Sequence, residues 1–237
     1  PASINQVFLE DLDNPLVVPE LSTFNVELNT RPLSMGPGML DVMCSDLEGL
    51  WQDCEVVANR HDVRMLAMGI LPTVQQSDLC LENISSLQRY QALNEQVLIM
   101  RQGKPIELDI EGAEHLRITH QDVMLEAATT SFQIHLKVDI KDAVAAYNNS
   151  KISSAPMVAL AANSPYLFGH DVWEETRIPL FEQAVSVGGS DYSKRVTFGL
   201  RYAEQSIVEC FEANRDRYPV MLPHLMDDAP EQLAHLR

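Results

Sequence analysis

The stretch ANSPYLFGHDVWEETRIPLF, residues 162–181, decides how the rest of the chain is interpreted. It opens with Asn163-Ser164-Pro165, two turn formers followed by a proline that cannot continue a helix. A second proline, Pro179, disfavours a helix further along. The pattern therefore predicts an extended segment over Glu174–Phe181.

Glu175 and Arg177 lie two positions apart in that segment. On a strand their side chains would share one face, whereas on a helix they would diverge by roughly 200°. A carboxylate beside a guanidinium suits a site that handles a metal ion and a phosphate. The alternative is an ion pair at a solvated strand edge, which contributes little to stability. These two residues alone leave both interpretations open.

The composition sets limits on the class of protein. The chain has 237 residues, of which 46% are hydrophobic and 22% charged, which is typical of a globular protein with a sizeable core. A net charge of −17 argues against nucleic acid as a partner, because binding its backbone requires clustered Lys and Arg. A nucleotide remains compatible, since carboxylates can hold it through divalent cations.

The cysteines and the hydropathy point to a reducing compartment. Cys44, Cys54, Cys80 and Cys210 form no C-x-x-C pair, so we expect neither a disulfide framework nor a zinc site, and a cytoplasmic protein. Cys44 and Cys54 fall in a helical pattern and are predicted to be small core residues. No apolar run approaches the roughly 20 residues that cross a bilayer, so no membrane association is expected.

The periodicity of apolar residues predicts a mixed series of elements. These are an irregular lead-in over Pro1–Pro19, a half-buried strand over Glu20–Asn29, helices over Met39–Asn59 and Leu79–Met100, a buried strand over Val63–Leu71, a hairpin of Ile106–Ile110 and Leu116–Thr119, a short helix over Gln121–Ala128, a strand over Ser131–Asp139, a helix over Lys141–Ala162 interrupted near Ser150–Pro156, a flexible loop at Gly188-Gly189-Ser190 and an amphipathic helix over Tyr202–Arg215. No parallel βαβ rhythm, G-x-G-x-x-G or Walker lysine motif occurs. We predict an α+β domain with a largely antiparallel sheet.

Two of the predicted strands carry ligand-type residues on a polar face. Glu27 alternates with apolar neighbours in the first strand, and Gln133, His135 and Lys137 alternate with apolar residues in the later one. Each has a simpler interpretation. Glu27 would also suit a solvated face, and a single His on a strand is more often structural than a ligand.

Four stretches resemble the bacterial carboxylate–amine ligase family that includes gamma-glutamylcysteine ligase. They are PELSTFNVELNTRP, ATTSFQIHLKV, AAYNNSKISSAPMVALAANSP and ANSPYLFGH…WEETRIPLFEQ, and together they cover most of the chain. The resemblance implies the glutamine-synthetase-like fold, in which a curved, largely antiparallel sheet with helices packed on one face lines a funnel.

The resemblance also implies a set of site residues. It assigns Glu20, Glu27, His135 and Glu175 to metal ligands and Arg177 to a contact with the transferring phosphate of ATP, while Gln133 and Asn163 would face the substrate. Mg²⁺ or Mn²⁺ would suit such ligands, since both prefer oxygen with an occasional imidazole. Asn163 would equally suit the end of a helix.

The expected activity is that of a ligase in glutathione biosynthesis. ATP would phosphorylate the side-chain carboxylate of glutamate, and an amine such as that of cysteine would attack the acyl phosphate. The expected partners are therefore small molecules. A homo-oligomer would be compatible with this activity. No G-x-S-x-G motif or cysteine in a His-bearing motif favours a nucleophilic enzyme. The alternative is a non-catalytic binding or regulatory relative that kept the fold.

The ends of the chain suggest an incomplete catalytic domain. The sequence begins at Pro1 and ends at His235-Leu236-Arg237. Members of the family carry an earlier glutamate-bearing strand and a later segment rich in His, Arg and Asn, and neither is found here. We expect residues 1–237 to form a single, incomplete ligase domain that is inactive by itself.

Overall fold

The computed structural model describes residues 1–187, 196–218 and 220, so the predicted loop at Gly188-Gly189-Ser190 lies outside the described residues. The helices are α1 (Asn5–Leu12), α2 (Met39–Arg60), α3 (Gln88–Met100), α4 (Ala143–Ala161), α5 (Arg177–Ala184) and α6 (Val208–Arg217). The strands are β1 (Val17–Pro19), β2 (Val26–Leu28), β3 (Ile106–Glu111), β4 (His115–His120), β5 (Tyr166–Leu167) and β6 (His170–Asp171). Short 3-10 helices are η1 (Gln76–Asp78), η2 (Leu81–Asn83), η3 (Val123–Ala128) and η4 (Ile140–Asp142).

The described strands form three separate antiparallel pairs. They are β1–β2, β3–β4 and β5–β6, with registers that include Val18 opposite Glu27, Leu108 opposite Ile118 and Leu167 opposite His170. Helices and antiparallel strands are mixed, as predicted for an α+β protein. The described residues do not form the single curved sheet that we expected.

The β3–β4 hairpin carries the larger core. Ile106, Leu108 and Ile110 alternate with exposed acidic residues, so one face of the hairpin is buried. Against it pack η3 and α5, through Met124, Leu125 and Leu180 among others. This hairpin and the short helix after it were predicted correctly, because alternation and a local turn decide both.

A second core joins the N-terminal segment to the end of α2. It contains Phe8, Val17, Leu50, Cys54, Val57 and Ala58. The prediction of an irregular lead-in was wrong. Phe8 is buried against this cluster, and the gain from burial supports an eight-residue helix, α1, that local propensity did not indicate. Cys54 is buried as expected, whereas Cys44 is exposed, because the first half of α2 extends beyond the core.

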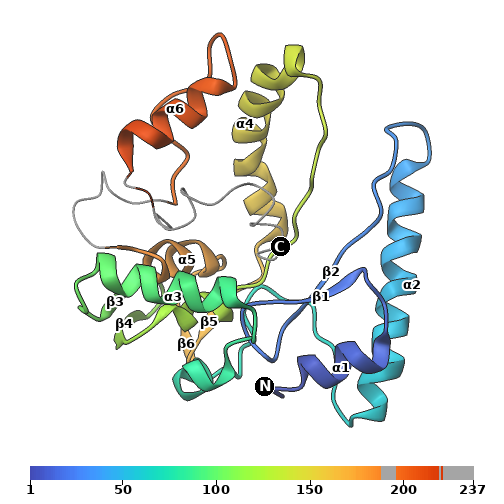
Figure 1. Ribbon diagram of the computed structural model, residues 1–237, viewed down its shortest axis with the longest axis vertical. Helices are drawn as coiled ribbons and strands as arrows, with labels where there is room; N and C mark the ends of the chain where they lie inside the picture. Colours follow the sequence, from blue (N-terminus) through green and yellow to red (C-terminus); the bar gives the residue numbers. More distant parts are fainter. Residues whose placement is uncertain (188–195, 219, 221–237) are drawn as a thin grey trace.

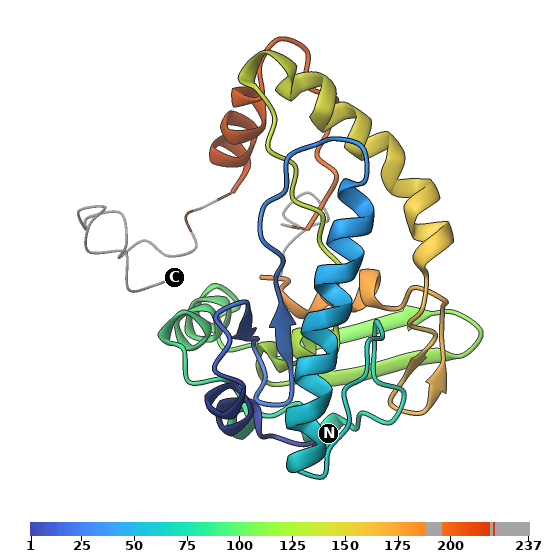
Figure 2. The ribbon, with the colours of Figure 1, turned by 90° about the vertical axis from the view of Figure 1, so that its right-hand side faces the viewer.

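Two arms extend from the part of the fold that contains these two cores (Figures 1 and 2). In each arm an extended segment runs away from the cores and a helix runs back toward them. Residues 29–38 lead to α2, and residues 129–139 lead through η4 to α4. The helix α4 runs without interruption through Pro156, contrary to prediction, and within it only Ala143 is buried.

Tertiary contacts also changed several predicted boundaries. Residues 63–71 contain no strand, and the predicted helix over Leu79–Met100 begins only at Gln88. Within the predicted range, Leu81–Asn83 form the short 3-10 helix η2, and Asn83 Nδ2 donates to the backbone oxygen of Asp78, so a local side-chain bond replaces the first part of that helix. Of the predicted strand over Glu20–Asn29, Val26–Leu28 pairs with β1, and Ser22 forms an isolated bridge with Ile84.

The amphipathic helix predicted over Tyr202–Arg215 is shorter and exposed. It begins at Val208, because the Glu209 carboxylate accepts hydrogen bonds from the backbone nitrogens of Glu204, Gln205 and Ser206 and holds them in a loop. No residue of α6 is buried. Among the described residues, no helix is long and apolar enough to span a membrane.

The turn of the β3–β4 hairpin provides a test of the fold. A Cβ on Gly112 would lie 1.8 Å from the backbone oxygen of Val172, which accepts a hydrogen bond from Ala113 N at 2.7 Å. Gly112→Ala must separate these segments and break that bond and the neighbouring bond from Glu114 N to Asp171 O. We expect a loss of about 2 kcal/mol or more in the free energy of unfolding, measured in urea.

Gly49 offers the matched control. It lies inside α2, and a Cβ there would meet no atom within 4 Å. Gly49→Ala should stabilise the helix by about 0.5–1 kcal/mol. Equal stability of the two variants would contradict the close approach of Gly112 to Val172.

Candidate active site

An isolated parallel β-bridge positions the site residues of the stretch 162–181. Ser164 pairs with Glu175, since Ser164 N donates to Glu174 O at 2.9 Å and Thr176 N donates to Ser164 O at 3.2 Å. Between them, β5 and β6 form a hairpin whose turn residues Phe168 and Gly169 both have positive φ. The chain thus folds back, and Asn163 comes close to Arg177.

The prediction that Glu174–Phe181 is extended was wrong, because Arg177 begins α5. Pro179 is the third residue of that helix, where the backbone nitrogen has no partner within the helix in any case. Glu175 precedes the helix, and its carboxylate reaches forward to Arg177. The two side chains therefore meet, although not across a strand face.

Glu175 and Arg177 form a largely buried ion pair. Glu175 is 1% exposed, and its Oε1 accepts from Arg177 Nε and, at 3.4 Å, from Ser164 Oγ. Among the described residues, its Oε2 is buried without any hydrogen-bond partner. A buried carboxylate oxygen without a partner is costly, so this atom is suited to receive a cation or a donor from a ligand.

Arg177 is held from two sides while remaining accessible. Its Nη1 donates to the backbone oxygen of Thr130, and about a quarter of the side chain is exposed (24%). Thr130 is itself fixed by Thr130 N, which donates to Gly69 O at 2.9 Å. The guanidinium is thus oriented by two separate parts of the chain.

Gly69 is the site residue that sequence reasoning missed. A Cβ there would lie 2.5 Å from Asn163 Oδ1 and 2.9 Å from Arg177 Cδ. Both side chains therefore pack over the bare backbone of Gly69, in a place where any side chain would displace them. The only signal in the sequence was a glycine inside an apolar run, which is ambiguous.

The other predicted residues lie in three places. Glu20 accepts a hydrogen bond from Leu21 N, and Glu27 lies in β2, partly exposed. Gln133 and His135 are exposed and contact each other, with His135 Nε2 at 3.1 Å from Gln133 Oε1. The structure brings together Asn163, Glu175 and Arg177 and pairs Gln133 with His135.

No group of three or more His, Cys, Asp or Glu that could hold a metal occurs among residues 1–187, 196–218 and 220. Glu175 fits a cation through its unpartnered Oε2. Glu20, Glu27 and His135 do not complete a coordination shell around it in this arrangement. The residues that the structure describes therefore do not assemble the predicted metal site.

The carboxyl of Glu126 lies near Glu20. Burial raises the pKa of the Glu126 carboxyl to about 7, and the negative charge of Glu20 adds to that rise. Burial also raises the pKa of Tyr90, the strongest of several effects on its hydroxyl. Glu126 lies in the apolar sequence VMLEAA of η3, where its neighbours on both sides are buried.

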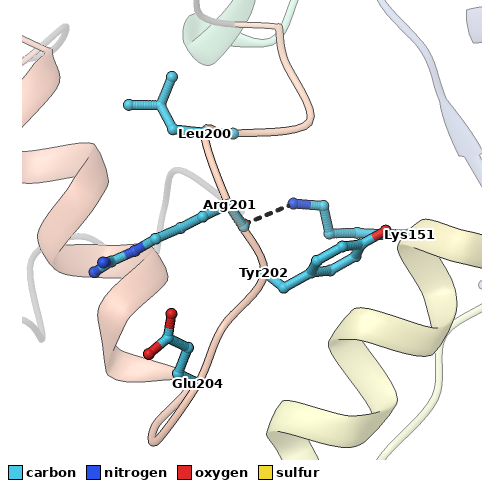
Figure 3. Close-up of a pocket in the computed structure, with 6 residues that line it drawn as sticks. Lys151, Leu200, Arg201, Tyr202 and Glu204 are labelled. Atoms are coloured by element: carbon cyan, nitrogen blue, oxygen red, sulfur yellow. Dashed lines mark hydrogen bonds between the residues drawn. The ribbon is translucent and has the colours of Figure 1, made fainter.

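Two cavities among the described residues lie elsewhere. One, of about 460 Å³, opens between α4 and the loop before α6 and is lined by Lys151, Gly199, Leu200, Arg201, Tyr202 and Glu204 (Figure 3). The other, of about 300 Å³, lies between α2 and residues 14–31. Neither is lined by a predicted site residue.

Comparison with known families agrees with the resemblance seen in the sequence. The model of Glutamate-cysteine ligase family 2 (GCS2) matches residues 4–190, which include every predicted site residue. The chain belongs to this family of ligases. No curated protein and no solved structure matches the chain.

The buried ion pair makes a prediction about stability. Arg177→Met would leave the Glu175 carboxylate buried without its counter-charge, at a cost of about 3–5 kcal/mol in the free energy of unfolding. Adding Glu175→Gln should recover a large part of that loss, because the buried charge is then gone. Urea unfolding of the two single variants and the double variant measures the coupling.

Arg117 is the control for this cycle. It pairs with Asp109 on the surface, and 72% of its side chain is exposed. Arg117→Met should change stability little, because solvent screens that pair. Additive effects of the substitutions at positions 175 and 177 would contradict the ion pair.

The Glu126 carboxyl predicts a dependence of stability on pH. Its folded pKa, about 7, lies above the ordinary value of 4.5, so the folded state binds the proton more tightly than the unfolded state. The free energy of unfolding should therefore fall as pH rises between about 4.5 and 7. Glu126→Gln should remove this component and gain up to about 3 kcal/mol relative to the native chain above pH 7.

Urea unfolding at pH 5 and pH 8 measures the effect. Glu95→Gln, on the exposed side of α3, is the matched control and should follow the native profile. A Glu126→Gln variant that gains nothing between pH 5 and pH 8 would contradict the burial of this carboxyl.

Proposed function

We propose that the protein is an ATP-dependent carboxylate–amine ligase that activates the side-chain carboxylate of glutamate for attack by an amine such as that of cysteine. The observation that carries this proposal is Arg177, whose guanidinium is anchored by Glu175 and Thr130 yet partly exposed beside Asn163. Membership of the glutamate-cysteine ligase family supplies the reaction class.

Arg177 would stabilise charge on the transferring phosphoryl group. Among the described residues, two of the five N–H donors of the guanidinium are shown in hydrogen bonds, through Nε and Nη1. The remaining donors are available for phosphate oxygens in a planar arrangement that suits them. Because protein contacts already fix the guanidinium, little reorganisation accompanies the reaction.

The proposed reaction has two steps. An oxygen of the glutamate side-chain carboxylate attacks the γ-phosphorus of ATP, the bond to the β,γ-bridging oxygen breaks, and ADP leaves. The amine then attacks the carbonyl carbon of the acyl phosphate, inorganic phosphate leaves and the nitrogen loses a proton, so that an amide forms. Asn163 and Gln133 are proposed to position the substrate through their amide groups.

Mg²⁺ or Mn²⁺ is proposed to bind at Glu175 together with Glu20, Glu27 and His135. When bound, such an ion would neutralise charge on the nucleotide phosphates. The unpartnered Oε2 of Glu175 supports its part in this site. The other three residues would have to approach it, and no step above depends on their doing so.

The wider setting is also proposed. The 237 residues would belong to a single ligase domain of glutamine-synthetase-like fold that works in the cytoplasm and is inactive without further segments. A binding or regulatory relative is the second candidate, and the distance between the predicted metal ligands favours it, since no three acidic or His residues of the described chain converge.

ADP release separates the two candidates. The complete protein, given Mg²⁺ and ATP, should release ADP over many turnovers only when both glutamate and an amine such as cysteine are present. The 237-residue chain alone should release almost none. A complete protein that binds glutamate or nucleotide without releasing ADP would support the regulatory candidate and contradict the ligase.

Gly69 tests which residues carry the activity. Gly69→Ala adds a methyl group that displaces Asn163 and Arg177 without removing any charge or donor. A displacement of about 1 Å should lower kcat about 10²-fold in the complete protein. Thermal unfolding should fall less than in Arg177→Met, because the guanidinium charge that faces Glu175 is still present. Gly49→Ala is the control, and equal kcat in the two variants would remove the Gly69 cluster from the site.

A further inference from the structure

The cavity of about 300 Å³ between α2 and residues 14–31 is lined by charged side chains of both signs. Arg31 follows the end of β2, and Asp46 and Asp53 belong to α2, which forms the other wall. Among the described residues, none of these three side chains takes part in a hydrogen bond or an ion pair. The cavity thus contains opposite charges that the described part of the protein leaves unpaired.

Neutral polar side chains complete the lining around these charges. Asn29, Thr30 and Ser45 all line the cavity, and none of their side chains is hydrogen-bonded within the described part of the chain. The wall that carries Asn29 is fixed, since Asn29 N donates to Leu16 O at 2.7 Å. Leu50, which is buried in the second core, supplies an apolar part of the lining. The cavity is therefore suited to a ligand with several polar groups and a short hydrocarbon chain.

The spacing of the two carboxylates limits the class of ligand. Asp46 and Asp53 lie seven residues apart, which places them on one face of α2 and about 10 Å apart along its axis. A single Mg²⁺ or Ca²⁺ ion, whose oxygen ligands lie about 2.0–2.6 Å away, would contact only one of them. A phosphate ion would be repelled by both. Two cationic groups on one ligand, in contrast, would each meet a carboxylate.

We propose that this cavity binds a basic amino acid such as lysine. The α-ammonium and side-chain ammonium groups of lysine are about 7 Å apart when the chain is extended, so one donates to Asp46 and the other to Asp53. The α-carboxylate then meets the guanidinium of Arg31, whose planar fork of donors suits it. The ligand carries a net charge of the opposite sign to that of the three side chains together, so the two are complementary.

The proposed site is separate from the candidate active site. Val26 and Leu28 of β2 pack against the second core together with residues of α2. Glu27 alternates with them, so its side chain lies on the opposite face of the strand. None of the predicted site residues lines the cavity. Binding of a basic amino acid here is therefore an addition to the proposed ligase reaction, which does not require it.

Three related probes distinguish the contacts. L-Lysine has all three charged groups, L-norleucine lacks the side-chain ammonium, and cadaverine lacks the carboxylate. The measurement is calorimetric titration of the complete protein at about 0.15 M salt, where exposed charges more than about 8 Å apart are largely screened. We expect a Kd of about 1 mM for lysine and binding about 5-fold weaker for each of the other probes, the scale of one exposed charge contact.

Substitutions assign each contact to a residue. Arg31→Gln should abolish the preference for lysine over cadaverine, because the carboxylate no longer meets a cation. Of Asp46→Asn and Asp53→Asn, one should abolish the preference for lysine over norleucine, and the other should weaken the binding of both. All three residues are exposed, so thermal unfolding should be unchanged. Asp41→Asn is the matched control, since it removes the same charge from an exposed position of α2 outside the cavity and should leave the affinity for lysine unchanged.

Three outcomes would overturn the proposal. The first is no binding of lysine up to about 20 mM, well above the expected Kd. The second is equal affinity for lysine, norleucine and cadaverine. The third is a loss of affinity in Asp41→Asn as large as that in Asp46→Asn and Asp53→Asn, which would mean that the net charge alone attracts the ligand. The titrations measure binding without ATP, so their result is independent of whether the protein releases ADP as a ligase.

Discussion

The carboxylate of Glu175, enclosed by protein at 1% exposure, is the constraint on which the arrangement of the site depends. A buried charge needs a counter-charge, and Arg177 supplies it from the first residue of α5. To reach that carboxylate, Arg177 must lie over a residue without a side chain, which explains Gly69, and beside a free carbonyl group, which explains Thr130. The ion pair thus brings together three parts of the chain, at Gly69, at Thr130 and at Glu175 with Arg177.

The stability of the molecule is unevenly distributed around this point. The β3–β4 hairpin, η3 and α5 share one core, and α1, β1 and the end of α2 share another. Beyond these cores the two arms bury little, since within α4 only Ala143 is buried. Such regions open with low free energy because few apolar contacts hold them. The Glu175–Arg177 ion pair lies where the arm that contains α4 joins the cores.

The sequence predicted the elements that local patterns determine. The helix α2 and the β3–β4 hairpin follow from periodicity and a turn, and both were placed within two residues of their bounds. The strand over Val63–Leu71 was wrong because an apolar run does not by itself distinguish a strand from a buried loop. Pro179 was misread because a proline is tolerated in the first turn of a helix. The proximity of Glu175 and Arg177 was predicted from a strand that does not form, while Gly69 and Glu126 depend on contacts across the chain.

The two segments that carry the remaining predicted ligands begin at a shared anchor. Asn25 Nδ2 donates to Ala127 O at 2.9 Å, which ties the start of β2 to the end of η3. From there the first segment continues through Glu27 into the arm that contains α2. The second segment continues through Thr130 and His135 into the arm that contains α4 (Figure 1). The distances of Glu27 and His135 from Glu175 therefore depend on how far the two segments separate beyond the Asn25–Ala127 hydrogen bond. Backbone hydrogen bonds between strands would fix that separation, and free strand edges do not supply them. Any strand that pairs with Ser131–Asp139 also fixes His135, so that the order of this edge and the assembly of the proposed metal ligands are governed by the same backbone hydrogen bonds.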